Sequence, residues 1–140
     1  MSFNVAVVGA TGMVGKAMMD VLVERKFSIK TLLPLASENS QGKTVRFQGK
    51  DIPVQTLTKS SFAGVDVALF SAGGDVSLEF APFAAAAGCY VIDNSSAFRM
   101  HAECPLVVPE VNPEDLGMAS KSKIIANPNC SPIQMLVALA

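Results

Sequence analysis

The sequence predicts a doubly wound α/β fold, in which a mostly parallel sheet carries helices on both faces. Short apolar runs alternate with helical stretches along the whole chain. The apolar runs have almost no polar interruption, as expected of strands that are covered on both faces. The chain has 140 residues and no linker, repeat or low-complexity stretch, so it has the length of one domain.

The first elements are a buried strand and an amphipathic helix. The strand is NVAVVGA, and from Gly12 the apolar period changes so that one helical stripe contains Val14, Met18, Val21 and Leu22. A second buried strand, IKTLLPLAS, follows this helix. The next two segments, KTVRF and DIPVQTL, are short and more polar, which predicts edge or accessory strands.

The alternation continues in the second half of the chain. DVALFSA and YVID are further buried strands, and between them lies an alanine-rich helix, DVSLEFAPFAAAAG. We expect this helix to begin at Asp75 or Ser77, to hold Pro82 in its first turns and to end before Gly88. PLVVPEVN and SKIIAN are two more extended runs with a short helix at PEDL between them, and SPIQMLVALA begins the last helix.

The composition excludes several classes of protein. Half of the residues are hydrophobic, 16% are charged and the formal net charge is −1, so the chain is neither disordered nor a basic nucleic-acid binder. No apolar run reaches the roughly 20 residues that cross a bilayer, and the N-terminus does not resemble a signal peptide. Three cysteines without CxxC spacing and one histidine, His101, argue against a disulfide framework or a metal site. We therefore expect a cytoplasmic protein whose apolar excess meets another domain or subunit.

Three glycines predict a nucleotide-binding loop. Gly9, Gly12 and Gly15 lie in VAVVGATGMVG, directly after the first strand and at the opening of the first helix. Gly9 permits a tight turn, Gly12 lets backbone N–H groups approach a pyrophosphate, and Gly15 lets the helix pack close to the strand. The alternative is a glycine-rich turn that binds nothing, although a plain turn does not need three glycines at this spacing. The pattern favours a Rossmann-type dinucleotide-binding fold.

The segment after the second strand bears on which dinucleotide is bound. PLASENSQGK presents Ser37 and Ser40 where NAD-binding sites usually place Asp or Glu. Hydroxyls, backbone amides and Lys43 would accept the 2′-phosphate of NADP, which a carboxylate would repel. NADP is therefore favoured, although Glu38 is close enough to oppose binding of its 2′-phosphate. The alternative is a plain polar turn.

Small residues follow the DVALF strand. Ser71, Ala72, Gly73 and Gly74 lie at its carboxyl end, which is the edge where open α/β sheets bind ligands. Residues of this size leave room for a cofactor, and they are equally compatible with a tight turn into the next helix.

The three cysteines have different surroundings. Cys89 begins the YVID strand and is expected to be a small core residue, whereas Cys104 is expected in a loop or at the start of a strand. Cys130 follows SKIIAN, is bracketed by two prolines and opens the last helix. A helix N-terminus favours the nucleophilic thiolate, and its N–H groups with the Asn129 side chain could bind an oxyanion. A buried thiol in a turn is the alternative.

A nucleophilic cysteine beside a nicotinamide site indicates one chemistry. The thiolate adds to an aldehyde or acyl carbon, and hydride then passes between the resulting hemithioacetal or thioester and the cofactor.

The motifs together resemble the N-terminal part of the aspartate-semialdehyde dehydrogenase family. VAVVGATGMVG, LASENSQGK, GVDVALFSAGG, VIDNSSAFRM, PLVVPEVN and ANPNCSPIQM occur in the family's order and spacing, almost from end to end. The resemblance implies an NADP-dependent oxidoreductase that converts L-aspartyl-4-phosphate to L-aspartate 4-semialdehyde by reductive dephosphorylation. The reaction passes through a cysteine acyl-thioester and belongs to lysine, threonine and methionine biosynthesis.

Roles for individual residues follow from their motif positions. The resemblance implies that Cys130 is the nucleophile, that Asn129 is its neighbour in the active site, and that Arg99 binds the substrate phosphate or carboxylate. A guanidinium binds such oxygens in a bidentate way, and an ordinary surface arginine is the alternative. The implied cofactor contacts are Thr11, Gly12, Met13, Val14, Ser37, Asn39, Ser40, Ser71, Ala72 and Gly73. Many relatives carry a basic residue at the position of Asn39, which weakens the inference to NADP over NAD without reversing it.

The resemblance also implies parts that residues 1–140 do not contain. The family's acid/base histidine, a glutamine that orients the substrate and further ligands lie in a second domain, which forms most of a homodimer interface. His101 matches no catalytic position. We interpret residues 1–140 as a dinucleotide-binding domain that ends just after the nucleophile. We expect it to bind cofactor weakly or not at all, to have no turnover alone, and to expose apolar surface through which self-association is plausible.

Two other functions compete with this interpretation. N-acetyl-γ-glutamyl-phosphate reductase runs the same acyl-phosphate chemistry, but its cysteine usually lies in a PGCYPT-like context, unlike NPNCSPIQ. A non-catalytic nucleotide-binding or partner-docking module, in which Cys130 is structural, is the second alternative. In both enzyme interpretations the substrate is a small molecule, and neither nucleic acid nor a membrane is a partner.

Overall fold

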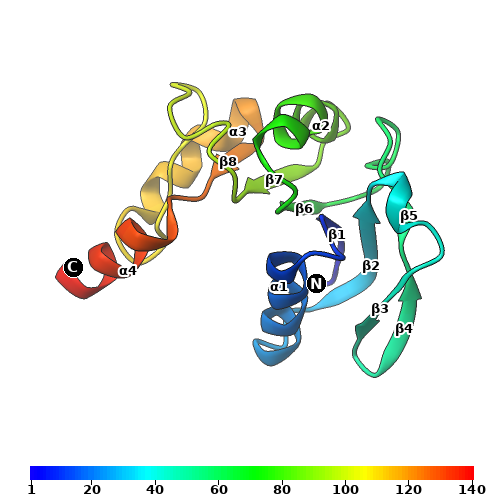
Figure 1. Cartoon of the computed structure of the whole chain (residues 1–140). Helices are drawn as coiled ribbons and strands as arrows, with labels where there is room; N and C mark the ends of the chain where they lie inside the picture. Colours follow the sequence, from blue (N-terminus) through cyan, green and yellow to red (C-terminus); the bar gives the residue numbers. More distant parts are fainter.

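A six-stranded sheet organises the chain, and all of its strand pairs are parallel (Figure 1). The computed structural model describes all of residues 1–140. In spatial order the strands are β5 (Gln55–Thr56), β2 (Ile29–Ala36), β1 (Phe3–Val8), β6 (Val67–Phe70), β7 (Tyr90–Asp93) and β8 (Ile124–Ala126). The chain builds outward from β1 to one side and then from β6 to the other, so the topology switches between β1 and β6. The predicted doubly wound α/β fold is confirmed.

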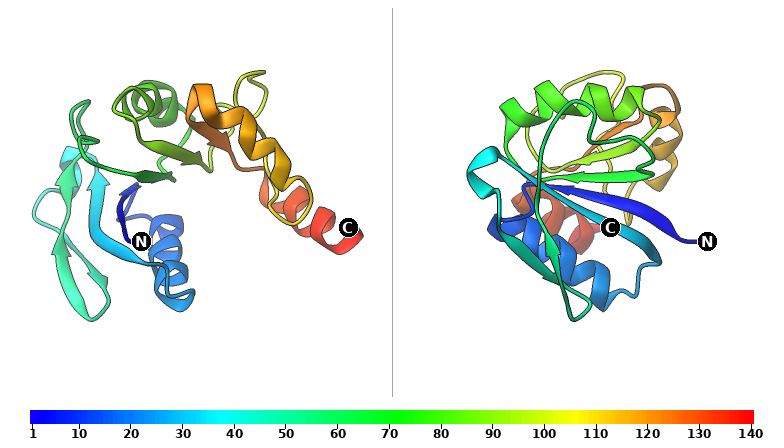
Figure 2. Two further views of the ribbon diagram at one scale, coloured as in Figure 1. Left: turned by 180° about the vertical axis from the view of Figure 1, so that it is seen from behind. Right: turned by 90° about the vertical axis from the view of Figure 1, so that its right-hand side faces the viewer.

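Helices and a hairpin cover the sheet from two sides (Figure 2). One face carries α1 (Met13–Glu24) and the hairpin of β3 (Thr44–Phe47) and β4 (Lys50–Pro53), while the other carries α2 (Gly74–Ala86). The remaining helices are η1 (Glu38–Ser40), η2 (Pro113–Met118), α3 (Ala119–Ser122) and α4 (Cys130–Leu139). None of these helices has both the length and the apolar character that crossing a membrane requires.

Two apolar cores lie on opposite faces of the sheet because successive strand residues point to opposite faces. On β1, Val5 and Val7 pack under α1, whereas Ala6 and Val8 pack under α2. All four side chains are buried. The uninterrupted apolar sequence of β1 is therefore explained by burial on both sides. Cys89 belongs to the core under α2, which confirms the prediction for this residue.

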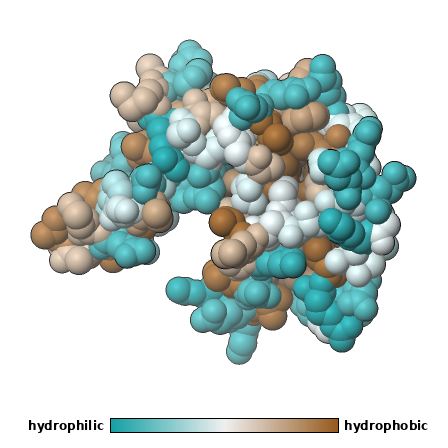
Figure 3. Space-filling model, viewed as in Figure 1, coloured by the Kyte–Doolittle hydropathy of each residue, from teal (hydrophilic) through white to brown (hydrophobic).

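Most of the apolar stripe of α1 does not face the core, and of its four residues only Leu22 packs against it. The buried residues of α1 are Gly15 and Met19, whereas Val14 and Val21 are 45% and 49% exposed. Together with Met18 and Leu22, these valines border a shallow groove that Leu69 of β6 closes. The stripe that the sequence predicts is present, but it lies on the side of α1 that faces α4 across the sheet (Figure 3).

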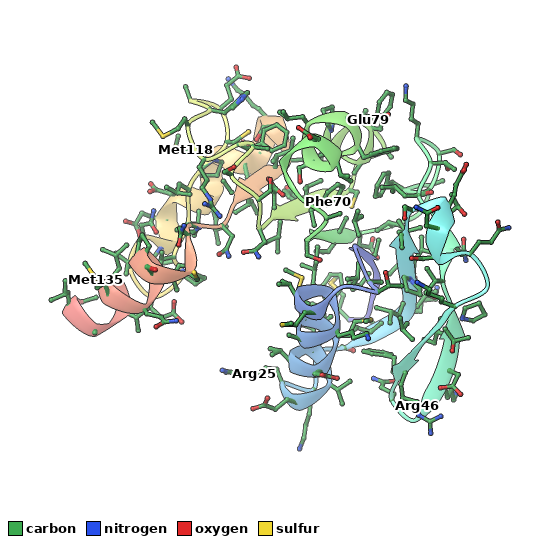
Figure 4. The ribbon with its side chains drawn as sticks, viewed as in Figure 1. Arg25, Arg46, Phe70, Glu79, Met118 and Met135 are labelled. Atoms are coloured by element: carbon green, nitrogen blue, oxygen red, sulfur yellow. The ribbon has the colours of Figure 1, made fainter.

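The sheet is uncovered between α1 and α4. Leu69 pairs with Ile92 and Ile92 pairs with Ile125, so the three side chains form a row across β6, β7 and β8. All three are only partly buried. Helix α4 has no charged and no fully buried residue, and Met135 projects from it into solvent (Figure 4). A parallel sheet normally has both faces covered, so this row is an unpartnered apolar surface.

Three local predictions are wrong in detail. Helix α2 begins at Gly74 behind an N-cap of Gly73, whose φ of 94° makes the turn out of β6, and not at Asp75 or Ser77. Pro82 is the ninth residue of α2, so it lies in the third turn rather than within the first turns. PLVVPEVN contributes only an isolated bridge between Leu106 and Ala126, because its backbone turns away from β8 after one contact.

Candidate functional site

The glycine loop lies at the switch point between β1 and β6. Gly9 has a φ of 86°, and a Cβ on it would lie 2.9 Å from Ser71 Oγ and 3.0 Å from the Ser71 carbonyl carbon. A Cβ on Gly15 would collide with the Gly9 carbonyl oxygen. Gly9 therefore permits the turn and the approach of β6, and Gly15 permits α1 to pack on the loop. These geometric roles agree with the sequence prediction.

A cleft of about 530 Å³ opens beside this loop, at the carboxyl edge of the sheet. It is lined by six of the predicted cofactor residues, which are Gly9, Thr11, Gly12, Ser37, Ser71 and Ala72. The other six lie outside the lining, namely Met13, Val14, Gly15, Asn39, Ser40 and Gly73. Of these, Gly15 and Ser40 are buried, and Ser40 Oγ lies 3.2 Å from Thr11 Oγ1. Gly15 and Ser40 therefore support the cleft from behind, because they contact the lining residues Gly9 and Thr11.

The far wall of the cleft was not predicted. Thr56 and Leu57 come from β5 and the residue after it, and Val76 and Phe80 come from α2. The i, i+4 spacing of Val76 and Phe80 marks one face of α2, which was the available signal in the sequence. Two apolar side chains opposite a glycine loop suit a flat ring such as adenine.

Charged residues border the cleft near the end of β2. Glu38 lines the cleft itself. An adjoining polar hollow of about 420 Å³ is lined by Lys16 and Lys43, and Thr11 borders both spaces. A carboxylate and two ammonium groups are therefore near the place where a ribose 2′ substituent would lie.

Cys130 is the first residue of α4 and is exposed, whereas Cys89 and Cys104 are buried. Burial raises the pKa of Cys89 to about 12 and also raises the pKa of Cys104. The alternative that Cys130 is a buried thiol in a turn is therefore wrong. The structure separates one accessible thiol from two that are protected.

Asn129 caps α4 and orients the thiol. Its Oδ1 accepts a hydrogen bond from the Ser131 N–H at 3.1 Å and from the Cys130 Sγ–H at 3.3 Å. The Ile133 N–H donates to the Asn129 carbonyl at 3.2 Å, and Pro132 has no N–H. Of the predicted oxyanion donors, the Cys130 N–H of the first turn and Asn129 Nδ2 of the N-cap have no protein partner and are available.

Arg99 is held at the ends of β7 and β8. Its Nε donates to the Asn127 carbonyl at 2.9 Å, and its Nη2 donates to the Asn94 carbonyl at 3.1 Å. The Asn127 Nδ2 donates to Asn94 Oδ1 at 2.7 Å, which joins the two loops. Arg99 is partly buried, so it is not an ordinary surface arginine, and its Nη1 group makes no hydrogen bond within the chain.

The structure brings Arg99 and Asn129 together but leaves the single histidine apart. Arg99 and Asn129 line the same hollow of about 430 Å³, and Cys130 follows Asn129 directly. His101 is exposed in a loop, where its ring lies 5.2 Å from the ring of Phe98. No group of three His, Cys, Asp or Glu side chains is arranged to hold a metal ion.

Comparison with known proteins identifies similar chains. The family model described as "Semialdehyde dehydrogenase, NAD binding domain" matches residues 4–119. Aspartate-semialdehyde dehydrogenase 2 of Vibrio cholerae is 57% identical over 137 residues, which are 98% of this chain and 41% of that protein. The chain thus spans about two fifths of the length of the curated relatives that it matches.

Solved structures agree in fold. The crystal structure of aspartate semialdehyde dehydrogenase II from Vibrio cholerae complexed with ASA has a TM-score of 0.96 and 56% identity, over 99% of this chain and 45% of that chain. The Candida albicans aspartate semialdehyde dehydrogenase with NADP has a TM-score of 0.79 and 27% identity, over 98% of this chain and 45% of that chain. Since the family model covers most of the sequence and these likenesses extend over nearly all of it, the chain belongs to the aspartate-semialdehyde dehydrogenase family, as its NAD(P)-binding domain.

Proposed function

We propose that this chain supplies the cofactor site and the nucleophile for NADP-dependent reductive dephosphorylation of L-aspartyl-4-phosphate to L-aspartate 4-semialdehyde. The observation that carries the proposal is the position of Cys130. The thiol is exposed at the N-terminus of α4, at the same carboxyl edge of the sheet as the glycine-lined cleft. The relatives named above, one of them complexed with ASA and one with NADP, support this assignment.

The cleft has the features that a dinucleotide needs. The turn at Gly9 and the close packing at Gly15 leave a backbone surface that no Cβ obstructs. We place the pyrophosphate at the N-terminus of α1, over the segment Thr11–Val14, where N–H groups and the helix dipole favour an anion. Ser37, Asn39 and Ser40 would lie near the adenosine ribose, and Ser71–Gly73 near the nicotinamide half. A bound NADPH would supply the hydride of the reaction and leave as NADP.

The preference for NADP rests on the lysines near the end of β2. Lys16 and Lys43 border the hollow beside Thr11 and can attract the additional phosphate of NADP. Glu38 opposes this preference because it lines the neighbouring cleft. Equilibrium titration of the chain with NADP and with NAD measures the two dissociation constants. Equal affinity for the two cofactors would refute the preference for NADP.

The thiolate of Cys130 attacks the acyl carbon of the aspartyl phosphate, the carbon–oxygen bond to phosphate breaks, and phosphate leaves with the electron pair. The product is a thioester on Cys130, and hydride addition to its carbonyl carbon followed by loss of the thiolate yields the aldehyde. The Cys130 N–H and Asn129 Nδ2 are the donors available to the negative oxygen. The Nη1 group of Arg99 is available to bind an anionic group of the substrate.

The unpartnered face of the sheet indicates where the rest of such an enzyme would contact this domain. Leu69, Ile92 and Ile125 form an apolar row beside the exposed stripe of α1. Because the relatives are more than twice as long, we propose that a second domain covers this row, supplies the general base and forms a homodimer interface. We expect the 140-residue chain alone to show no turnover, since His101 does not line the hollow beside Cys130 and its ring is tilted against that of Phe98 instead.

A single acylation experiment tests the proposed chemistry. The chain is incubated with L-aspartyl-4-phosphate, and peptide mass spectrometry locates any hydroxylamine-sensitive acyl adduct. We expect an adduct on Cys130, none in Cys130→Ser, and less with N-acetyl-γ-glutamyl phosphate. An adduct on another residue would refute the role of Cys130, and preference for the glutamyl substrate would favour the competing reductase.

A further inference from the structure

Asp93 is a buried acid that the proposed chemistry does not use. It is the last residue of β7, has an exposed fraction of 0% and lies on the face of the sheet that α2 covers. The chain contains one salt bridge, Arg46–Asp51 on the surface, so no cation pairs with Asp93. Burying a carboxyl group without a cation is unfavourable unless hydrogen bonds satisfy its oxygens. Its partners therefore show what the group does.

The carboxylate of Asp93 accepts three hydrogen bonds, two of them from the loop that follows it. Oδ1 accepts from Ser77 Oγ of α2 at 2.6 Å and from the Ser95 N–H at 3.2 Å. Oδ2 accepts from Ser95 Oγ at 2.7 Å. Ser95 Oγ in turn accepts from the Ala97 N–H at 3.1 Å. The chain thus winds around the carboxylate directly before it reaches Arg99.

The end of this loop carries Arg99, whose guanidinium is fixed by two backbone carbonyls. Nε and Nη2 donate to the carbonyls of Asn127 and Asn94, so these two carbonyls set the orientation of the guanidinium and of its Nη1 group. The two bonds form only while the loop holds Cα of Arg99 within reach of them. The Asp93–Ser95 hydrogen bonds fix the start of the loop, and the burial of Phe98 fixes its end. We propose that Asp93, acting through Ser95, is a positioning residue that holds Arg99 in the orientation needed to bind the anionic group of the substrate. The anion-binding part of this inference rests on the proposed function.

Three serine-to-alanine variants separate positioning from stability. Ser95→Ala removes the hydroxyl that joins Asp93 to the Ala97 N–H, whereas Ser77→Ala removes a bond from the same carboxylate on its helix side. Ser96→Ala is the matched control, because Ser96 is exposed in the same loop and its side chain makes no hydrogen bond. Ser95→Thr keeps the hydroxyl and should rescue the effect of Ser95→Ala.

The first readout is the Arg99 Nε–H signal in nitrogen–proton correlation NMR of the 140-residue chain, assigned by its loss in Arg99→Lys. We expect slow solvent exchange of this proton in the native chain, since it donates to the Asn127 carbonyl. Exchange should become roughly tenfold faster in Ser95→Ala, as for the loss of one hydrogen bond. It should be unchanged in Ser77→Ala, Ser96→Ala and Ser95→Thr. The unfolding temperature should fall in both Ser77→Ala and Ser95→Ala, because each variant loses a hydrogen bond to Asp93. A stability measurement therefore cannot distinguish positioning of Arg99 from a purely structural role.

The second readout is the affinity for inorganic phosphate. We expect Ser95→Ala to weaken phosphate binding roughly three- to tenfold, with Ser96→Ala at the native value. The inference is overturned if Ser95→Ala leaves both the Arg99 exchange rate and the phosphate affinity at the values of Ser96→Ala. If Arg99→Met does not weaken phosphate binding, the proposed substrate role of Arg99 fails. The exchange rate of the Arg99 proton still decides whether the Asp93–Ser95 pair positions the side chain.

Discussion

The two ends of the sheet's carboxyl edge are built in different ways. At the β1–β6 end, the cleft is shaped by the absence of side chains at Gly9 and Gly15 and by strands buried on both faces. At the β7–β8 end, Arg99 and Cys130 are placed by hydrogen bonds between side chains and loops, and one face of the sheet is uncovered. The first end depends on packing within the domain. The second depends on a polar network and has an apolar surface that nothing in the chain covers.

The largest expected difference between these regions is in thiol reactivity. At neutral pH, Cys130 should react with iodoacetamide on the order of a hundredfold faster than Cys89 or Cys104, because it is exposed and they are buried. Mass spectrometry of the labelled peptides measures the three rates. Equal rates in the folded chain would show that the α4 end does not present an accessible thiol.

The packed side of α1 should be much more sensitive to substitution than its exposed stripe. Met19→Ala should lower the free energy of unfolding by about 3 kcal/mol, because it leaves a cavity in the core. Val21→Ala on the same helix should change it by less than about 0.5 kcal/mol. Urea denaturation of both variants measures the difference, and similar losses would mean that the stripe is also packed in solution.

The glycine loop should tolerate no side chain where it meets α1. Gly15→Ala should destabilise the chain by about 2 kcal/mol, since the new Cβ collides with backbone that has little freedom to move. Gly117→Ala is the control, because a Cβ there meets nothing within 4 Å. The two variants are compared by urea denaturation, and a neutral Gly15→Ala would refute the close packing of helix on loop.

The last expected effect appears only at alkaline pH and concerns the core under α2. Cys89 has its pKa raised by burial to about 12 in the folded chain, so above the ordinary thiol pKa the unfolded chain releases a proton that the folded chain retains. Stability from this group is complete below about pH 8.5 and is lost as the pH rises toward 12, by up to about 1.4 kcal/mol per pH unit. Cys89→Ala should remove this part of the pH dependence in denaturation curves between those values. If the free energy of unfolding of Cys89→Ala falls with pH as steeply as that of the native chain, the raised pKa of Cys89 is contradicted.

Much of the fold and part of the site were predictable from local pattern. The uninterrupted apolar run of β1, the glycine spacing and the cysteine after β8 are each local, and each feature lies where the sequence predicts. Only half of the predicted cofactor residues line the cleft, because motif position does not distinguish a lining residue such as Thr11 from a supporting one such as Ser40. Phe80 was missed because α2 reaches the cleft only through the pairing of β6 with β1.

The sequence by itself determined the order of strands and helices, the glycine loop after β1 and the thiol at the start of α4. These features depend on apolar periodicity and on residues close together in the chain. Only the tertiary structure decided that most of the stripe of α1 faces away from the core, that Arg99 is bonded to the ends of β7 and β8, and that Asp93 is buried against Ser77. Periodicity shows that a helix has an apolar side, but which neighbour covers that side, and which carbonyl accepts a donor, depend on contacts between distant segments.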